Sequence, residues 1–236
     1  MMPAMIRGFL LFFLLFSAPI VADAQALRVF GSDFRPYAYE HQGRVAGTAT
    51  DRVREILAAA GEVGVIEIYP WARAYRAAKA TPGALLYPVA RTPERENDFI
   101  WLGELVDYDV RLWRLADRTD IAPTTLGDIA GLTVGGLTDD VKTGYLQARG
   151  VPVALQSDEE TLLTMLVAGR IDLMPADRVS FLARLQRLAL PVGDFVPVLA
   201  LPEISQPLYL AITPGGDPAL VRKLAAAFSP RSLLHN

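Results

Sequence analysis

Two charged side chains that lie far apart in the sequence each follow a short apolar run with the length and composition of a buried strand. Arg95 comes shortly after the run 84–89, and Asp177 comes shortly after the run 171–174. In open α/β sheets, ligands bind outside the carboxyl ends of the strands. A guanidinium can hold a carboxylate through two parallel hydrogen bonds, and an aspartate can accept from an ammonium group. The two residues therefore suit a zwitterionic ligand.

Both residues also have structural interpretations, which stay open at this point. Asp177 precedes a helix-like segment, where an acid most often caps the helix by accepting from free backbone N–H groups. Arg95 has acidic neighbours with which it can form an ion pair on an exposed turn: Glu94, Glu96 and Asp98.

Further candidates for a binding site come from the first half of the chain. Trp71 follows Pro70 at a corner between a strand-like run and a helix-like segment, which favours a place in a cleft. Tyr37 and Tyr87 could each line a binding site, or could be half-buried tyrosines that pack against the core. Arg73 offers a second guanidinium for a ligand, or an ion pair within its own half of the molecule.

The N-terminus has the pattern of a cleaved export signal. Arg7 precedes an unbroken apolar run, 9–16, and small residues then alternate around two candidate cleavage points, after Ala24 and after Ala26. The run is well short of the ~20 apolar residues that span a bilayer, so a membrane anchor is the weaker alternative. We predict that residues 1–26 are a signal peptide and that the mature chain is soluble in the periplasm.

The composition excludes several classes of function. The chain has 23 basic and 26 acidic residues, a net charge of −3, and no cysteine. A balance so close to neutral argues against nucleic acid or an anionic membrane as the partner. Without cysteine there is no disulfide framework, thiolate metal site or Cys-linked lipid anchor. The only histidines are His41 and His235, and no nucleophile, phosphate-loop or dinucleotide motif is present. We expect no cofactor and no metal.

Strand-like and helix-like segments alternate along the mature chain. Repeated βα units predict an α/β fold with mainly parallel sheets flanked by helices. The run 106–115 is apolar and extended, and is interpreted as a crossover between two halves. The predicted strands are 27–30, 65–69, 84–89, 133–137, 152–156, 171–175, 195–200 and 208–213. The predicted helices are 51–60, 71–80, 139–149, 158–169, 177–188 and 218–228.

Several segments, taken in order, resemble the family 3 extracellular solute-binding proteins, the polar amino-acid receptors of ABC importers. The resemblance extends over essentially the whole mature length. It implies a two-lobed periplasmic binding protein of type II, with two hinge strands and closure around ligand. Lobe 1 is then expected over about 27–109 and 206–236, and the inserted lobe 2 over 110–205. The segments are Asp33-Phe34-Arg35-Pro36-Tyr37-Ala38-Tyr39, Gly43 to Gly47 with Asp51, Pro70-Trp71-Ala72-Arg73, Thr92-Pro93-Glu94-Arg95, Leu126 to Gly135, and Gly169-Arg170-Ile171-Asp172.

The resemblance also implies roles for individual residues. Arg95 matches the arginine that holds the ligand α-carboxylate, and Asp177 matches the acid that holds its α-ammonium group. Trp71 matches one member of an aromatic pair that encloses the ligand side chain, and Phe34 lies near the position of the other. With Tyr37, Arg73 and Tyr87 these residues complete the candidate ligand-binding set.

The sequence departs from the family pattern at two places. Family members usually have small hydroxyl residues just before the Thr-x-x-Arg motif, where this chain has Pro88 and Ala90. At the start of the first helix of lobe 2, Asp139 and Asp140 would repel a nearby carboxylate. A cationic, amine-bearing or larger amphipathic ligand is therefore an alternative to an ordinary amino acid.

The function predicted from the sequence is capture of a small polar, amino-acid-like solute by a monomeric periplasmic receptor, which delivers it to an ABC permease. The first alternative is an orphan or sensory receptor that serves a membrane signalling protein. A further alternative is a lyase similar to cyclohexadienyl dehydratase, with Asp139, Asp140 or Asp177 as the acid in the cleft. Because no catalytic motif is present, we expect binding without turnover.

Overall fold

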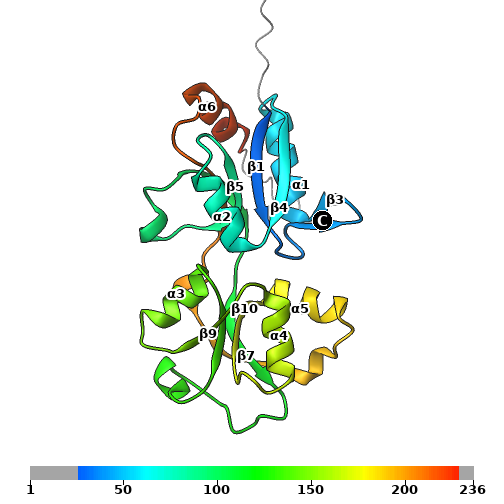
Figure 1. Ribbon diagram of the computed structural model, residues 1–236, viewed down its shortest axis with the longest axis vertical. Coiled ribbons are helices and arrows are strands. Elements are labelled where there is room, and N and C mark those ends of the chain that lie inside the picture. The colour runs from blue at the N-terminus through cyan, green and yellow to red at the C-terminus, as the bar shows by residue number, and fades with distance from the viewer. Residues whose placement is uncertain (1–25, 229–236) are drawn as a thin grey trace, which may run out of the picture.

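The computed structural model describes residues 26–228, which form two lobes stacked along the long axis of the molecule (Figure 1). The predicted export signal, apart from Ala26, and the end of the predicted return segment, 229–236, lie outside the described residues. Across 26–228, no helix is both long and apolar enough to cross a membrane.

Lobe 1 contains a five-stranded sheet made of β1 (Leu27–Ser32), β4 (Gly64–Tyr69), β5 (Leu85–Ala90), β6 (Ile100–Val106) and β12 (Leu208–Ile212). The strand order is β4-β1-β5-β12-β6. β1 pairs in parallel with β4 and β5, whereas β12 is antiparallel to β5 and β6. The remaining elements are the hairpin β2 (Tyr39–His41) and β3 (Arg44–Ala46), the 3₁₀ turn η1 (Pro93–Arg95), and the helices α1 (Thr48–Ala59), α2 (Trp71–Lys79) and α6 (Pro218–Ala227).

Helices cover both faces of this sheet because successive strand residues point to opposite sides. Val29 of β1 packs in a cluster with residues of α1 and α6, and its neighbour Phe30 packs in a second cluster with residues of α2. The apolar positions of α1 follow the helical period, since Val53, Ile56 and Leu57 are all buried. Pro70 stands as the N-cap of α2 with φ −53°, so the start of this helix follows the end of β4 directly.

Lobe 2 combines an antiparallel sheet with a parallel pair of strands. The sheet consists of β10 (Met174–Asp177), β7 (Val110–Leu115) and β11 (Phe195–Ala200), in that order. β8 (Val134–Leu137) pairs in parallel with β9 (Val153–Gln156) and reaches the sheet through a bridge from Val134 to Leu173. The other elements are α3 (Val141–Gln147), α4 (Glu159–Val167), α5 (Arg178–Arg187), η2 (Leu126–Ile129), η3 (Val192–Asp194) and η4 (Pro202–Ile204).

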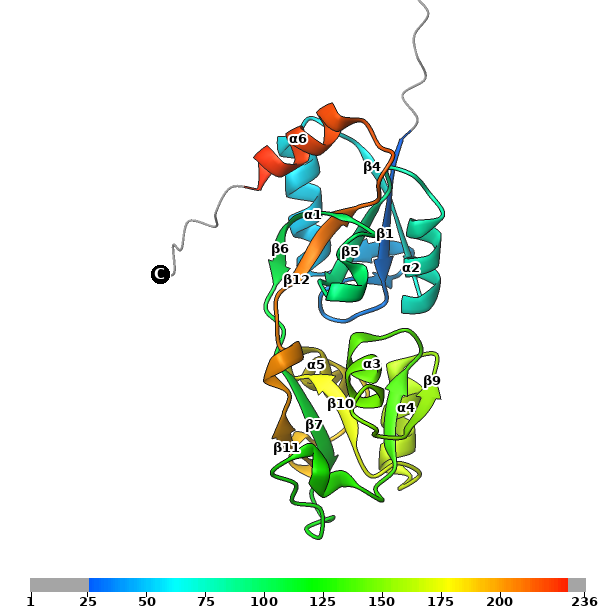
Figure 2. The same cartoon turned by 90° about the vertical axis from the view of Figure 1, so that its left-hand side faces the viewer.

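The core of lobe 2 is also split by its sheet. Leu112 packs in a cluster with Leu146 of α3, whereas Trp113 packs with residues of α4 and α5. The rings of Trp113 and Phe181 are stacked with their centroids 4.3 Å apart. The helices α4 and α5 are thereby fixed against the sheet, and α5 lies at the end of the lobe that faces lobe 1 (Figure 2).

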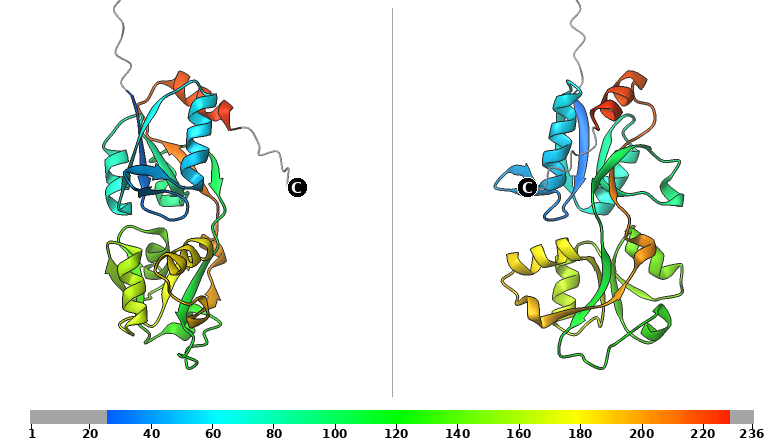
Figure 3. Two further views of the ribbon diagram at one scale, coloured as in Figure 1. Left: turned by 90° about the vertical axis from the view of Figure 1, so that its right-hand side faces the viewer. Right: turned by 180° about the vertical axis from the view of Figure 1, so that it is seen from behind.

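The chain runs between the lobes in two neighbouring connections. Residues 107–109 lead from β6 to β7, and residues 205–207 lead from η4 to β12, which returns to the sheet of lobe 1 (Figure 3). We name the lobes by the boundaries predicted from the sequence, after residues 109 and 205, and these boundaries remain a prediction.

Every strand and helix predicted from the sequence has a counterpart in the structure, displaced by a few residues at its ends. Two features were not predicted. The hairpin of β2 and β3 is too short to show a period in the sequence, and β6 begins at Ile100, well before the predicted crossover run 106–115. The lobe 1 sheet is mixed and the three-stranded sheet of lobe 2 is antiparallel, because the two strands that follow the crossings, β7 and β12, pair antiparallel with their neighbours.

Candidate binding site between the lobes

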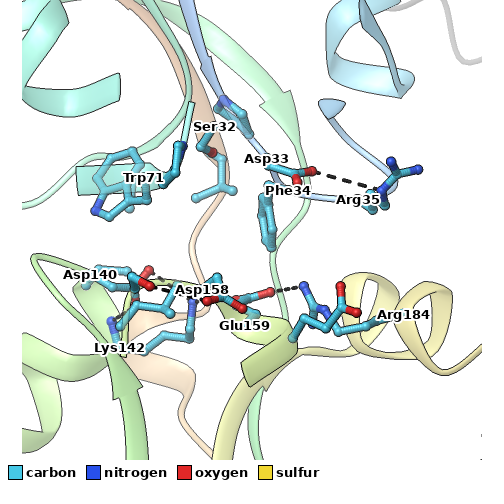
Figure 4. A pocket seen from close by; sticks show the side chains of 18 of the residues that line it. Ser32, Asp33, Phe34, Arg35, Trp71, Asp140, Lys142, Asp158, Glu159 and Arg184 are labelled. Carbon is cyan, nitrogen blue, oxygen red and sulfur yellow. Dashed lines mark hydrogen bonds and ion pairs between the residues drawn. The ribbon is translucent and has the colours of Figure 1, made fainter. Parts of the chain in front are cut away.

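A cavity of about 320 Å³ lies between the lobes and is lined by residues of both (Figure 4). Lobe 1 contributes residues from the ends of β1 and β5, the start of α2, and Arg95. Lobe 2 contributes the starts of α3 and α4 and two arginines of α5, while Tyr108 and Leu208 lie beside the connections. The cavity therefore meets the carboxyl ends of the parallel strands of lobe 1, as expected for ligand sites in such sheets.

Arg95 is buried at the lobe 1 side of the cavity and has no acidic ion-pair partner in the described part of the chain. Its side chain is 9% exposed. Nη2 donates to the backbone carbonyl of Asp139 at 2.9 Å, and the guanidinium lies 5.0 Å from the ring centroid of Trp71 and 5.2 Å from that of Tyr75. The neighbouring acids Glu96 and Asp98 pair with Arg91 and Lys79 instead. The surface ion pair considered from the sequence is thus not formed.

The carbonyl of Asp139 joins the two lobes. It accepts from Nε1 of Trp71 at 2.8 Å as well as from Arg95. Asp139 lies in the left-handed region with φ 59°, a conformation that aspartate tolerates better than most residues. Because both donors belong to lobe 1 and the acceptor to lobe 2, Trp71 and Arg95 hold the lobes together at the edge of the cavity.

Phe34 forms part of the aromatic lining of the cavity beside the hinge. Its ring lies 5.1 Å from that of Tyr37 and 6.1 Å from that of Tyr108. Figure 4 shows Phe34 and Trp71 on the lobe 1 side, facing the charged residues of lobe 2. The two rings supply apolar walls, and the ring of Trp71 also attracts the guanidinium of Arg95.

Lys142 is the buried cation on the lobe 2 side. Its side chain is 4% exposed, and Nζ lies 3.1 Å from Asp140 Oδ2, 3.5 Å from Glu159 Oε1 and 2.9 Å from the hydroxyl of Tyr108. Burial disfavours the charged ammonium, but the charges of Asp140 and Glu159 outweigh it and raise the pKa of Lys142 well above its ordinary value. Lys142 is therefore charged, in an ion pair that is hidden from bulk water.

Glu159 and Arg184 continue the row of charged side chains on the lobe 2 side of the cavity (Figure 4). Nη2 of Arg184 donates to Oε2 of Glu159, and both side chains are buried. Burial opposes ionisation of Glu159, yet the charges of Arg184 and Lys142 keep the pKa of its carboxyl below the ordinary value. The other terminal nitrogen of Arg184, Nη1, is buried and has no hydrogen-bond partner.

Asp177 does not line this cavity. It is 1% exposed and caps α5 by accepting from the backbone N–H of Ser180 at 2.9 Å. Oδ1 accepts from the N–H of Asp109 at 3.1 Å, and Oδ2 accepts from the hydroxyl of Tyr37 at 2.9 Å. The helix-cap interpretation of Asp177 is thus present in the structure, and Oδ2, the oxygen that caps α5, also accepts from Tyr37 of lobe 1.

Three of the seven predicted site residues line the cavity, namely Phe34, Trp71 and Arg95. Tyr37 lies at the hinge, where it binds Asp177. Tyr87 lies in the core of lobe 1 with its hydroxyl 2.8 Å from that of Thr50. Arg73 is exposed, and its guanidinium stacks 4.2 Å from the ring centroid of Tyr69.

The charged residues of lobe 2 were not found from the sequence. Lys142, Glu159 and Arg184 each stand on an ordinary amphipathic helix, where charged residues usually face solvent. These three side chains are buried in contact with one another, an arrangement of distant segments that a single sequence does not show. In the described residues no group of three or more histidines, cysteines or acids is placed to hold a metal ion.

Comparison with protein-family models and with curated proteins finds no match. Solved structures are similar to this chain in fold. A histidine kinase sensor domain with similarity to periplasmic binding proteins has a TM-score of 0.76 at 20% sequence identity, covering 86% of this chain and 88% of that one.

Two binding proteins are also similar to this chain in fold. An ancestral arginine-binding protein bound to arginine has a TM-score of 0.72 at 18% identity, covering 86% of this chain and 90% of its own. The substrate-binding protein AbpA of an amino acid ABC transporter from Streptococcus pneumoniae, bound to L-arginine, has a TM-score of 0.71 at 14% identity, covering 86% of each chain. These values confirm the expectation for the fold: the chain has the two-lobed fold of the periplasmic binding proteins.

Proposed function

We propose that the mature chain is a periplasmic receptor that captures a small polar, amino-acid-like solute between its lobes and delivers it to an ABC permease. The observation that carries the proposal is the buried guanidinium of Arg95, which lies beside Trp71 in an interlobe cavity and has no acidic ion-pair partner within residues 26–228. A buried charge normally has a counter-charge, and a ligand carboxylate would supply it. A cavity of about 320 Å³ also lies within the ~300–1,000 Å³ range typical of small-molecule sites.

Capture would work by joining the lobes through the ligand. Arg95 and Trp71 belong to lobe 1, and Lys142 and Arg184 belong to lobe 2. A solute that contacts both sets stabilises the closed arrangement relative to an open one, because only the closed arrangement brings both sets within reach. The hydrogen bonds from Trp71 and Arg95 to Asp139 would be retained or exchanged for ligand contacts during closure.

A sensory receptor is the second candidate, and the likeness to a histidine kinase sensor domain favours it. The capture step would be the same, and the partner would be a membrane signalling protein. Permease or kinase genes beside the gene of this chain would distinguish the two. No turnover is expected in either case, because the carboxylate of Asp140 is paired with Lys142 and that of Asp177 lies outside the cavity.

A thermal-shift screen of the purified mature chain tests the proposal, with amino acids, polyamines, opines and aromatic acids as probes. A solute at 100 times its Kd should add about 2.7 kcal/mol to the stability of the protein. Calorimetry should then give one site per chain, and mass spectrometry should recover the solute unchanged. If no solute of any class stabilises the protein, the receptor function is wrong; if the solute is converted, the lyase interpretation is right.

A further inference from the structure

The acids around the cavity are already engaged by groups of the protein. None of them is left as a free partner for a ligand ammonium group. Asp33 faces Arg35 at 4.0 Å, Asp140 and Glu159 pair with Lys142, Glu160 pairs with Arg187, and Asp158 caps α4 by accepting from the backbone N–H of Thr161 at 2.7 Å.

The two loosest candidates for an ammonium partner are poor ones. Asp33 is the most weakly paired of these acids, but its side chain is 60% exposed, and an ion pair with so exposed a carboxylate contributes little to affinity. Both oxygens of Asp177 accept hydrogen bonds from the protein, and one of the donors is the hydroxyl of Tyr37. For Asp177 to bind an ammonium group, the hydrogen bond from the hydroxyl of Tyr37 would first have to break.

Two guanidinium groups that line the cavity, one from each lobe, can still donate to a ligand oxygen. Arg95 of lobe 1 meets only backbone carbonyls and aromatic rings. Arg184 of lobe 2 lines the cavity, is 6% exposed, and has no partner at Nη1. A buried guanidinium nitrogen without an acceptor is costly, and a ligand oxygen would remove that cost.

We propose that the ligand is a short dicarboxylate, with one carboxylate on Arg95 and the other on Arg184. This inference rests on the proposed function and names the class of solute that the same cavity takes. The ligand is short because a cavity of about 320 Å³ is near the lower end of the ~300–1,000 Å³ typical of such sites. Lys142 lies next to Glu159 and offsets the repulsion between Glu159 and a second carboxylate at Arg184.

The same class includes plain dicarboxylates and acidic amino acids, which differ in the amino group. Because no acid of the cavity is free to hold an ammonium, the amino group contributes little to affinity. Glutarate and glutamate should therefore bind with similar affinity. Glutamine has an amide in place of the side-chain carboxylate of glutamate, and pentanoate has only one of the two carboxylates of glutarate. Both should bind more weakly.

Calorimetry on the mature wild-type protein tests these statements with succinate, glutarate and adipate, then with glutamate, glutamine and pentanoate. We expect the best dicarboxylate to bind at least about tenfold more tightly than pentanoate and glutamine, since truncation of one side of a buried charge pair has effects of this size or larger. Glutamate should lie within about threefold of glutarate.

Substitution of the lobe 2 arginine provides a second test. Arg184→Gln should weaken the binding of glutarate at least roughly tenfold and should leave the affinity for pentanoate within about twofold of wild type. Arg187→Gln is the matched control, because Arg187 lies on the same helix and lines the same cavity but is already paired with Glu160. The control should leave both affinities within about twofold. The ligand series on the wild-type protein does not depend on either variant folding.

The outcomes separate this inference from the proposed function. If pentanoate or glutamine equals glutarate, or if neutral amino acids bind and dicarboxylates do not, the dicarboxylate inference is wrong while the receptor function stands. If none of these acids binds and no other solute of the wider screen stabilises the protein, both are wrong.

Discussion

The hydroxyl of Tyr37 in lobe 1 donates a 2.9 Å hydrogen bond to Oδ2 of Asp177 in lobe 2. The same carboxylate accepts from the backbone N–H of Asp109, in the connection between β6 and β7, and of Ser180 in α5. One buried acid thus links lobe 1, the hinge and a helix of lobe 2. This link fixes the lobes on the hinge side, whereas Trp71 and Arg95 fix them on the other side through Asp139.

Tyr37→Phe removes the donor from lobe 1 while keeping the ring. We expect a loss of about 1.5–3 kcal/mol in the free energy of unfolding, since the bond is buried and its acceptor is a carboxylate. Denaturant titration measures this loss. Tyr209→Phe is the control, because the hydroxyl of Tyr209 bonds Glu104 in an exposed place and should contribute at most ~1 kcal/mol. Equal losses for the two variants would show that the hydrogen bond from Tyr37 to Asp177 contributes no more to stability than an exposed one.

Asp177 should make stability depend on pH. Burial raises the pKa of its carboxyl above the ordinary value of 3.8, although the hydrogen bonds from Ser180, Asp109 and Tyr37 act in the opposite direction. A raised folded-state pKa gives stability that is complete below the unfolded-state pKa and is lost as pH rises through the folded-state pKa.

The stability of wild type relative to Asp177→Asn should therefore fall as pH rises from about 4 across the mildly acidic range. Urea titrations of both proteins at several pH values measure the difference. A difference that grows with pH would mean that the hydrogen bonds outweigh burial and that the carboxylate is the favoured form in the folded protein.

Lys142→Met should destabilise the apo protein strongly. Its ammonium is buried between Asp140 and Glu159, so removal leaves buried carboxylates with fewer partners, at a cost of about 3–5 kcal/mol. Lys79→Met is the matched control, since Lys79 pairs with Asp98 at the surface and should contribute about 0–1 kcal/mol. Chemical denaturation of both variants measures the effect, and a loss below about 1 kcal/mol for Lys142→Met would argue against a buried ion pair.

Much of the fold was accessible from the sequence because each element carries its own pattern. Val53, Ile56 and Leu57 mark the buried side of α1 by their spacing, and Pro70 marks the start of α2. The motif around Arg95 pointed to a residue that does lie in the interlobe cavity.

The rest of the site depends on contacts between distant segments. Asp177 follows a strand in the expected way, but whether it faces the cavity depends on Tyr37, which is 140 positions away. Arg184 becomes a cavity residue because the C-terminal half of α5, with Arg184 and Arg187, borders the cavity and because Glu159 pairs with Arg184. Neither relationship leaves a local signal in the sequence.

Trp71 should report ligand binding by fluorescence. Its indole N–H bonds Asp139 across the lobes and its ring lines the cavity, so both its hydrogen bond and its surroundings change when the lobes move. Titration of a solute found in the screen should give a saturable change in emission that Trp71→Phe abolishes. The other two tryptophans, Trp101 and Trp113, serve as an internal reference. A signal that persists in Trp71→Phe would place the reporter elsewhere.

Calorimetry of Arg95→Ala with the tightest solute from the screen tests most directly whether the interlobe cavity is the binding site. Removal of a desolvated charge partner costs ~2–5 kcal/mol, so binding should weaken at least roughly thirtyfold. Arg28→Ala, which removes an exposed arginine of lobe 1 paired with Glu67, should bind like wild type. Affinity of Arg95→Ala within about threefold of wild type, a loss of only ~0.6 kcal/mol, would contradict ligand capture by Arg95.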